Sequence, residues 1–270
     1  MSTQFLTWDE FKAEAARLRE NAFPLVPILF RGQSNSDWDL DTTLERSGHD
    51  EGVAQYYRLM LRIKTEIEVA TGTKWGEDPS VFALEQLAID YDSFSLALSN
   101  LPHYAYMAYL RHHGFPCPLL DWSRSPFVAA YFAFREDLGS DRNVAIYAYA
   151  DRTTSFKTSS SENSQIHRLG PYVAAHKRHF SQQSEYTICL KYADSRWHFV
   201  PHSSVFDSNP EGGTQDVLKR FILSAGERPK VLRELNDYNL NAFTLFGSTE
   251  GLMESLSNRE EIGGYGRALL

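Results

Sequence analysis

The sequence predicts a single α+β domain that spans residues 1–270 and carries a helical insertion at about 50–112. Three observations lead to this fold class. Apolar residues recur at helical spacing in some segments and form short, strand-like runs in others. No internal repeat and no linker-like stretch divides the chain. Its 270 residues are enough to build one large hydrophobic core.

The N-terminal segment predicts a helix followed by a strand. Thr7 and Glu10 have the spacing of a capping box, so we expect a helix from here to about Glu20. Residues 25–30 form a short apolar run after a proline, which predicts a strand that ends at the following Arg-Gly pair. The polar segment 34–48 is rich in turn residues.

The insertion and the centre of the chain predict helices and then alternating strands and helices. Apolar residues at helical spacing predict helices at 53–69, 80–98 and 102–110. The elements expected after the insertion are a minimal strand at 119–120, a helix from Pro126 to Phe134 and a strand at 144–149.

The C-terminal half predicts a long loop and then further strands and helices. Residues 151–170 are rich in serine and threonine and show no period, which is typical of a loop. The elements expected after it are strands at 186–192 and 198–203, a helix at 214–220, a strand at 221–224, a helix at 228–238 and a strand at 242–246.

Composition and charge limit the classes of function. The formal net charge is −8, which argues against the broad basic surface that duplex nucleic acid requires but leaves room for a local basic pocket. Aromatic residues make up 13% of the chain, so stacking surfaces are available. The two cysteines, the absence of a secretion signal and the absence of an apolar run of membrane length predict a soluble cytoplasmic protein without a membrane partner.

The densest set of polar residues beside an apolar segment lies at 110–126. We expect Asp121 to be a buried hydrogen-bond acceptor that fixes this loop and His113 to orient it. Ser123 and Ser125 precede a proline that begins a helix. They either cap this helix or hold a ligand near its N-terminus, where free N–H groups bind anions.

Two further pieces of sequence carry candidate site residues. Arg31 stands at a strand end before Gly32, where its guanidinium can bind a phosphate or form a structural ion pair. Gln183 and Glu185 open a strand, and the period of two places both side chains on the same face. These two side chains either contact a sugar and an incoming nucleophile or belong to a solvated strand edge.

The nine histidines do not predict a metal site. Their pairs (112 with 113, 176 with 179, 198 with 202) lack a carboxylate or thiolate at the spacing of a metal centre, and no HExxH motif is present. A metal-dependent hydrolase is therefore not favoured.

Several of these motifs resemble those of the FRG domain family, which is named for a Phe-Arg-Gly signature. The segment 30–33 fits the opening motif, and 111–134 resembles the central motif with its Leu-Asp-Trp and Ser-Pro pairs. The segment 178–186 is similar to a later motif that contains Gln-Gln, and 216–246 resembles the closing portion. The resemblance extends over about 28–255.

The sequence departs from the family pattern at three positions. Cys117 and Pro118 stand where the family usually has Thr-Arg, and Ser184 stands where glycine is usual. Glu185 occupies a position that varies in the family.

The order of a strand arginine, a Ser-x-Ser before a helix and a Gln-x-Glu on a later strand is also similar to the Arg–Ser–Glu pattern of ADP-ribosyltransferases. This resemblance implies a split mixed or antiparallel β-sheet, with NAD as co-substrate. It implies that Arg31 grips the pyrophosphate, that Glu185 stabilises the oxocarbenium-like transition state and that Gln183 orients the acceptor. The other residues that it implies for NAD binding are Gly32, Gln33, His113, Asp121, Trp122, Ser123, Ser125 and Tyr131, with Trp122 or Tyr131 stacked on nicotinamide.

The same resemblance implies a mono-ADP-ribosyltransferase that modifies a macromolecule, as a bacterial toxin or an anti-phage defence effector. We expect nucleic acid rather than protein as acceptor, by a narrow margin, because the aromatic content and the basic segment 176–179 suit an unpaired base. A toxin would also need a neutralising protein partner. The alternative is a non-catalytic nucleotide-sensing or partner-binding module that keeps the pocket without the chemistry.

Overall fold

A computed structural model describes residues 2–21, 27–48, 52–76, 86, 101–151, 164–170, 177–207 and 216–263. The helices of this part of the chain are α1 (Trp8–Glu20), α2 (Thr43–Arg46), α3 (Val53–Thr71), α6 (Tyr104–His112), α7 (Pro126–Phe134), α8 (Lys177–Ser181), α9 (Ser204–Asp207), η2 (Ala225–Glu227), α10 (Arg228–Asp237), α11 (Ala242–Phe246) and α12 (Thr249–Gly263). Its strands are β1 (Ser2–Phe5), β2 (Leu29–Gln33), β3 (Leu120–Ser123), β4 (Asn143–Asp151), β5 (Gln165–Arg168), β6 (Ser184–Ala193), β7 (Arg196–Phe199) and β8 (Asp216–Ser224).

These strands form one mixed sheet, so the predicted α+β class is confirmed. The strand order is β1-β8-β4-β2-β3-β6-β5, and β7 pairs with β6. The pair β1–β8 is parallel, whereas the other registered pairs are antiparallel. The pairing of β4 with β8 runs from Asn143 opposite Ser224 to Asp151 opposite Asp216. In contrast, β2 and β3 are registered through one residue pair in the described chain, Phe30 opposite Ser123.

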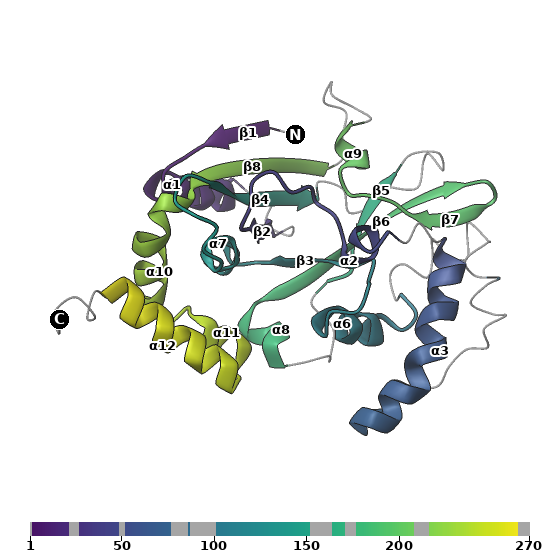
Figure 1. Cartoon of the computed structure of the whole chain (residues 1–270). Helices are drawn as coiled ribbons and strands as arrows, with labels where there is room; N and C mark the ends of the chain where they lie inside the picture. Colours follow the sequence, from purple (N-terminus) through teal and green to yellow (C-terminus); the bar gives the residue numbers. More distant parts are fainter. Residues whose placement is uncertain are drawn as a thin grey trace.

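This weak junction between β2 and β3 separates two halves of the sheet that have different helical covers. The half β1-β8-β4-β2 packs against α1, α7 and α10 in a core that contains Phe30. On the other side of the junction, β6 and β7 pack against α3 and α6 in a core that contains Tyr56. Figure 1 shows α10 and α12 at one end of the molecule and α3 at the other. A third core, which contains Leu29 and Trp122, crosses the junction.

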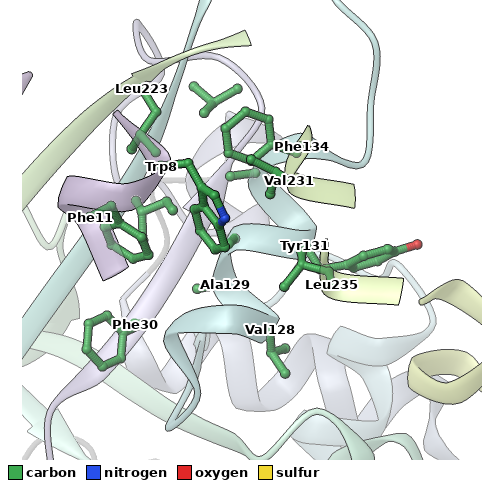
Figure 2. Packing of buried hydrophobic residues seen from close by; sticks show 14 of the residues in the cluster. Trp8, Phe11, Phe30, Val128, Ala129, Tyr131, Phe134, Leu223, Val231 and Leu235 are labelled. Carbon is green, nitrogen blue, oxygen red and sulfur yellow. The ribbon is translucent and has the colours of Figure 1, made fainter. Parts of the chain in front are cut away.

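Helix α7 lies directly on β2 beside the junction. Pro126 occupies its first turn, and the Ser125 hydroxyl accepts a hydrogen bond from the N–H of Val128 (3.3 Å), as expected for an N-cap. Figure 2 shows the buried side chains of α7 packed with those of α1 and α10. A Cβ atom at Gly32 would lie 1.9 Å from the carbonyl oxygen of Ala129. Gly32 is therefore required for the close approach of helix and strand.

Several elements begin and end where the sequence predicts. The capping box of α1 is confirmed, because the Thr7 hydroxyl accepts from the N–H of Glu10 (3.3 Å) and the Thr7 N–H donates to the Glu10 carboxylate (2.8 Å). The predicted helix at 53–69 is α3, which ends before Gly72 in the left-handed conformation (φ 69°). The predicted strands at 144–149 and 186–192 correspond to β4 and β6.

Other predictions fail near the N-terminal half of the sheet. Of the strand expected at 25–30, residues 25 and 26 lie outside the described residues; the described strand β2 runs from Leu29 to Gln33, because its ladder with β4 covers those five residues. The minimal strand at 119–120 is the longer β3, and the segment 34–48 contains the short helix α2. The helix expected at 80–98 lies outside the described residues apart from Gln86.

The C-terminal third contains the largest errors. Residues 216–224 form one continuous strand, β8, so the helix expected at 214–220 is wrong over its described part; the long ladder with β4 overrides the local pattern. The strand expected at 242–246 is helix α11, capped by Asn241. Part of the expected loop, 165–168, is β5, and 152–163 lies outside the described residues. The strand expected at 198–203 is β7, which ends at Phe199.

In the described part of the chain, no helix combines the length and the apolar character needed to cross a membrane.

Candidate functional site

A cleft of about 820 Å³ lies where β2 and β3 diverge. This volume is typical of small-molecule and cofactor sites, which measure roughly 300–1,000 Å³. Three parts of the chain that are far apart in sequence converge on it. Its lining residues are Phe30, Arg31, Gly32, Gln33, Ser34, Asp37, Trp38, Asp39, Asp41, Arg46, Arg111, Asp121, Trp122, Ser123, Ala129, Phe132, Arg135, Glu136, Gln182 and Ser184.

Arg31 joins the two diverging strands through its side chain. Its Nη1 donates a hydrogen bond to the carbonyl oxygen of Asp121 (2.7 Å) and lies 3.1 Å from the Asp121 carboxylate. The Arg31 side chain is only 10% exposed. The guanidinium thus fills the place where the backbone ladder between β2 and β3 stops.

Asp121 accepts bonds from two arginines at once. Arg111 of α6 donates to one carboxylate oxygen, and Arg31 pairs with the other. Burial by itself would raise the pKa of Asp121, but the positive charges of Arg111 and Arg31 outweigh it and hold this pKa well below its ordinary value. Asp121 is therefore a carboxylate at neutral pH, and it keeps both arginines at the wall of the cleft.

Three buried polar atoms on the cleft wall have no hydrogen-bond partner among the described residues. They are the Nε atoms of Arg31 and Arg111 and the Oε1 atom of Gln33. Buried polar groups in folded proteins are nearly always hydrogen-bonded, so each of these atoms needs an explanation. The two N–H groups require an acceptor, and the amide oxygen requires a donor. A ligand that presents both would satisfy all three atoms.

At the start of β6, only the side chains on one face of the strand are directed toward the cleft. Ser184, the first residue of β6, lines the cleft, as does Gln182 in the turn before the strand; Tyr186 lines a smaller pocket of about 200 Å³ that shares Arg111 and Asp121 with the cleft. Because side chains alternate along a strand, Glu185 points to the opposite face. The resemblance to ADP-ribosyltransferases places Gln183 and Glu185 at the NAD site, whereas Ser184, the residue between them, lines the cleft.

Glu185 is instead enclosed by two arginines. Arg124 donates from Nε to Oε1 of Glu185, and Arg168 of β5 donates from Nε to Oε2 and from Nη2 to Oε1 (2.8 Å). The Glu185 residue is fully buried. Gln183 is exposed and has a left-handed backbone (φ 48°) just before β6. Neither residue lines the cleft.

The two serines of the Ser-x-Ser motif hold the backbone. Ser123 lines the cleft, donates from its hydroxyl to the carbonyl oxygen of Gln182 (2.8 Å) and accepts from the N–H of Ser125 (3.0 Å). It thereby ties β3 to the start of β6. Ser125 caps α7 and does not line the cleft.

The remaining predicted residues are distributed over the cleft, the core and the surface. Trp122 is 4% exposed, and its indole N–H donates to the Thr187 hydroxyl (2.8 Å), so only part of this residue reaches the cleft. Tyr131 is buried, donates to Glu254 (2.8 Å) and lines a separate pocket beside α10 and α12. His113 is exposed at the end of α6, with its ring 4.3 Å from that of Tyr109.

Sequence reasoning missed several lining residues. Arg111 lies in the polar segment 110–126, directly before the histidine pair 112–113, but no pattern in the sequence distinguishes it as a binding residue. Trp38 is an aromatic residue within a polar segment and is 49% exposed, a combination that itself marks a candidate binding residue. Glu136 follows α7, and one of its carboxylate oxygens accepts from the Ser34 hydroxyl (3.1 Å). No pattern in the sequence places Glu136 opposite β2.

Within the described residues, no group of three or more His, Cys, Asp and Glu side chains is arranged to hold a metal ion. His202 is buried, its Nε2 lies 2.8 Å from the Thr187 hydroxyl, and burial together with the charge of Arg31 lowers its pKa to about 3. This imidazole is therefore neutral at physiological pH.

Comparison with known proteins identifies one family. The chain has no significant match among curated proteins or among solved structures. The model of the FRG domain family matches residues 26–142. The match contains the Phe30–Gln33 motif, the segment 50–112 that was predicted to be a helical insertion, and the central motif at 111–134, and it ends before β6. The residues that match the FRG domain family, 26–142, therefore contain β2, β3 and α7 and most of the residues that line the cleft.

Proposed function

We propose that the cleft binds NAD and that the protein transfers ADP-ribose from NAD to a macromolecule. The observation that carries this proposal is the pair of arginines on the cleft wall, Arg31 and Arg111, whose buried Nε–H groups have no hydrogen-bond partner among the described residues. A pyrophosphate offers oxygen acceptors to such groups, and a guanidinium binds phosphate oxygens at two points. The divergence of β2 from β3 also supports a split sheet of the ADP-ribosyltransferase type.

The proposed reaction needs a carboxylate near the ribose. Transfer breaks the bond between C1′ of the ribose and the nicotinamide ring nitrogen, and the electron pair leaves with neutral nicotinamide. Positive charge develops on the ribose, and a preorganised carboxylate stabilises it. A nucleophile of the acceptor then forms a bond to C1′ and gives up its proton.

We assign this carboxylate to Glu136. Glu136 lines the cleft, is exposed to solvent and is oriented by the Ser34 hydroxyl. Asp121 is already neutralised by two arginines, and the Glu185 carboxylate is enclosed on the other face of the sheet. Arg31 holds the phosphates, so its loss is expected to weaken NAD binding more than the rate of the bound complex.

Incubation with NAD labelled at its adenylate phosphate, together with cell lysate, tests the proposal. The expected result is release of nicotinamide and transfer of label to a macromolecule. Digestion with nuclease and with protease, in separate samples, identifies the acceptor class, for which we expect nucleic acid. Absence of both nicotinamide release and transferred label, with protein shown to be folded by circular dichroism, would contradict the enzyme proposal.

A second candidate is a nucleotide-binding module without catalysis. The enclosure of Glu185 between Arg124 and Arg168 favours it, because the Gln-x-Glu carboxylate of the motif is withheld from the cleft. In that case titration calorimetry would show NAD binding while no nicotinamide is released. A neutralising protein partner is expected only for the toxic enzyme.

A further inference from the structure

Trp38 is the aromatic side chain best placed to meet a ligand in the cleft. It lines the cleft and is 49% exposed, between the exposed carboxylates Asp37 and Asp39. Neither carboxylate forms an ion pair with another described residue, although Oδ1 of Asp37 accepts a hydrogen bond from the Ser36 hydroxyl (3.4 Å). An indole flanked by two carboxylates that are not paired with a described cation favours a cationic planar group, through stacking and cation–π attraction.

The segment that carries Trp38 is held in place by two strands of the sheet. The Tyr147 hydroxyl of β4 donates to the carbonyl oxygen of Trp38 (3.4 Å), and Nε2 of Gln33 donates to the carbonyl oxygen of Asp39 (2.9 Å). The N–H of Asp37 donates to the side-chain oxygen of Asn35 (2.9 Å). The backbone beneath the indole is therefore preorganised, although the ring itself is half exposed.

Gln33 supplies the second, independent observation. It is 5% exposed and lines the cleft, and its Oε1 has no hydrogen-bond partner among the described residues. Because Nε2 is already bound to the backbone of Asp39, the amide orientation is fixed and the acceptor Oε1 is the atom left for a ligand. The missing partner must be an N–H or O–H donor.

We propose that Trp38 and Gln33 form the nicotinamide subsite of this cleft, with the charged ring of NAD⁺ stacked on Trp38 and its carboxamide N–H bound to Oε1 of Gln33. This inference rests on the proposed function and replaces Trp122 and Tyr131 as the stacking residues. The cleft then matches a ligand with an anionic centre at Arg31 and Arg111 and a cationic ring at Trp38. NAD⁺ has this charge distribution. NADH carries an uncharged nicotinamide ring, and ADP-ribose lacks the nicotinamide ring altogether.

Calorimetric titration of the full chain with three ligands tests the subsite. The ligands are carba-NAD⁺, whose nicotinamide bond is not cleaved, NADH and ADP-ribose. We expect carba-NAD⁺ to bind more tightly than NADH. We expect Trp38→Leu to weaken carba-NAD⁺ binding by roughly 3- to 30-fold, the range of a cation–π contact of about 0.5–2 kcal/mol. ADP-ribose binding should change less than about twofold, and Trp38→Phe should retain most of the carba-NAD⁺ affinity.

A matched pair of charge changes checks the acidic flank. Asp39→Asn should weaken carba-NAD⁺ binding about threefold, whereas Asp237→Asn, an exposed aspartate of α10 that does not line the cleft, should not. Equal affinity for carba-NAD⁺ and NADH, or an equal loss for all three ligands in Trp38→Leu, would overturn the subsite while leaving NAD binding intact. If the unmodified protein binds none of the three ligands, the proposed function is overturned as well.

Discussion

Asp121 of β3 and Glu185 of β6 lie on neighbouring strands, and each carboxylate is paired with two arginines. The two clusters differ in whether the arginines keep N–H groups that are not hydrogen-bonded within the described chain. Asp121 is paired with Arg31 and Arg111, its side chain is 42% exposed, and the Nε–H of each arginine has no hydrogen-bond partner in the described part of the chain. Glu185 is fully buried, and all of its bonds to Arg124 and Arg168 are made within the protein.

The register of the two strands explains why the clusters face different surroundings. Asp121 lies opposite Tyr186, and Trp122 lies opposite Glu185. Since neighbouring side chains of a strand point to opposite faces, the two carboxylates are separated by the thickness of the sheet although they are close in the ladder. The same residue types thus form an open, ligand-directed cluster on one face and a closed, structural cluster on the other.

The sharpest test of this contrast compares Glu136→Gln with Glu185→Gln. If the cleft is the catalytic site, Glu136→Gln should lower the rate of nicotinamide release by about 10²- to 10³-fold, the cost of losing a preorganised electrostatic group. Its melting temperature should change little, because Glu136 is exposed. A normal rate in Glu136→Gln would reject the assignment of this carboxylate.

Glu185→Gln should act on stability. Removing one partner of a buried ion pair costs about 3–5 kcal/mol, and the part exposure of Arg124 (41%) places the expectation near 3 kcal/mol. Denaturant titration should show this loss in the free energy of unfolding, together with a lower melting temperature. Unchanged stability with abolished nicotinamide release would instead return Glu185 to the catalytic role that the Arg–Ser–Glu resemblance implies.

Replacing one arginine in each cluster separates ligand binding from structure. Arg31→Lys keeps the charge but loses the fork of N–H donors, so ADP-ribose should bind about 10- to 100-fold more weakly. Arg168→Lys, the matched change in the closed cluster, should alter ADP-ribose affinity by less than about twofold. Equal effects of the two substitutions on affinity, measured by calorimetry, would remove the distinction between the clusters.

The smallest expected effect is the pH dependence of the open cluster. Because the pKa of Asp121 lies below its ordinary value, its ion pairs contribute stability fully above about pH 4 and lose it as the pH falls further. Asp121→Asn should therefore be less stable than the unmodified protein by about 1 kcal/mol at pH 7, a figure reduced for solvent exposure. The difference should shrink between pH 4 and pH 2 in urea titrations. A difference that is constant with pH would show that the carboxylate charge does not matter.

Local patterns in the sequence predicted the elements whose ends are set by local bonds. The Thr7 capping box, Pro126 at the start of α7 and Gly72 at the end of α3 each act through neighbours in the chain. The strand predicted at 221–224 is the second part of β8, whereas the first part was wrongly predicted as a helix because its conformation depends on pairing with β4, more than sixty residues away in sequence. Helix α11 was mistaken for a strand because a five-residue segment, apolar except for Thr244, is too short to show a distinguishing period.

The candidate site was predictable in part for the same reason. Arg31, Gln33, Asp121 and Ser123 come together in one cleft, as their motifs suggested. The face of β6 was not predictable, because a Gln-x-Glu pattern shows that two side chains share a face but not which face. That choice depends on the cross-strand register with β3, which only the folded sheet defines.

The single registered pair between Phe30 and Ser123 also has a mechanical consequence. Pulling β4 away from β8 would break a ladder that extends from Asn143 to Asp151, whereas a hinge rotation at Phe30 would disturb the backbone bonds of one pair. The sheet is therefore most compliant along the line where the cleft lies. A force or a bound molecule that acts on the two halves would bend the protein there first. The hydrogen bond from the Arg31 guanidinium to the carbonyl oxygen of Asp121 is the side-chain contact that would resist this bending.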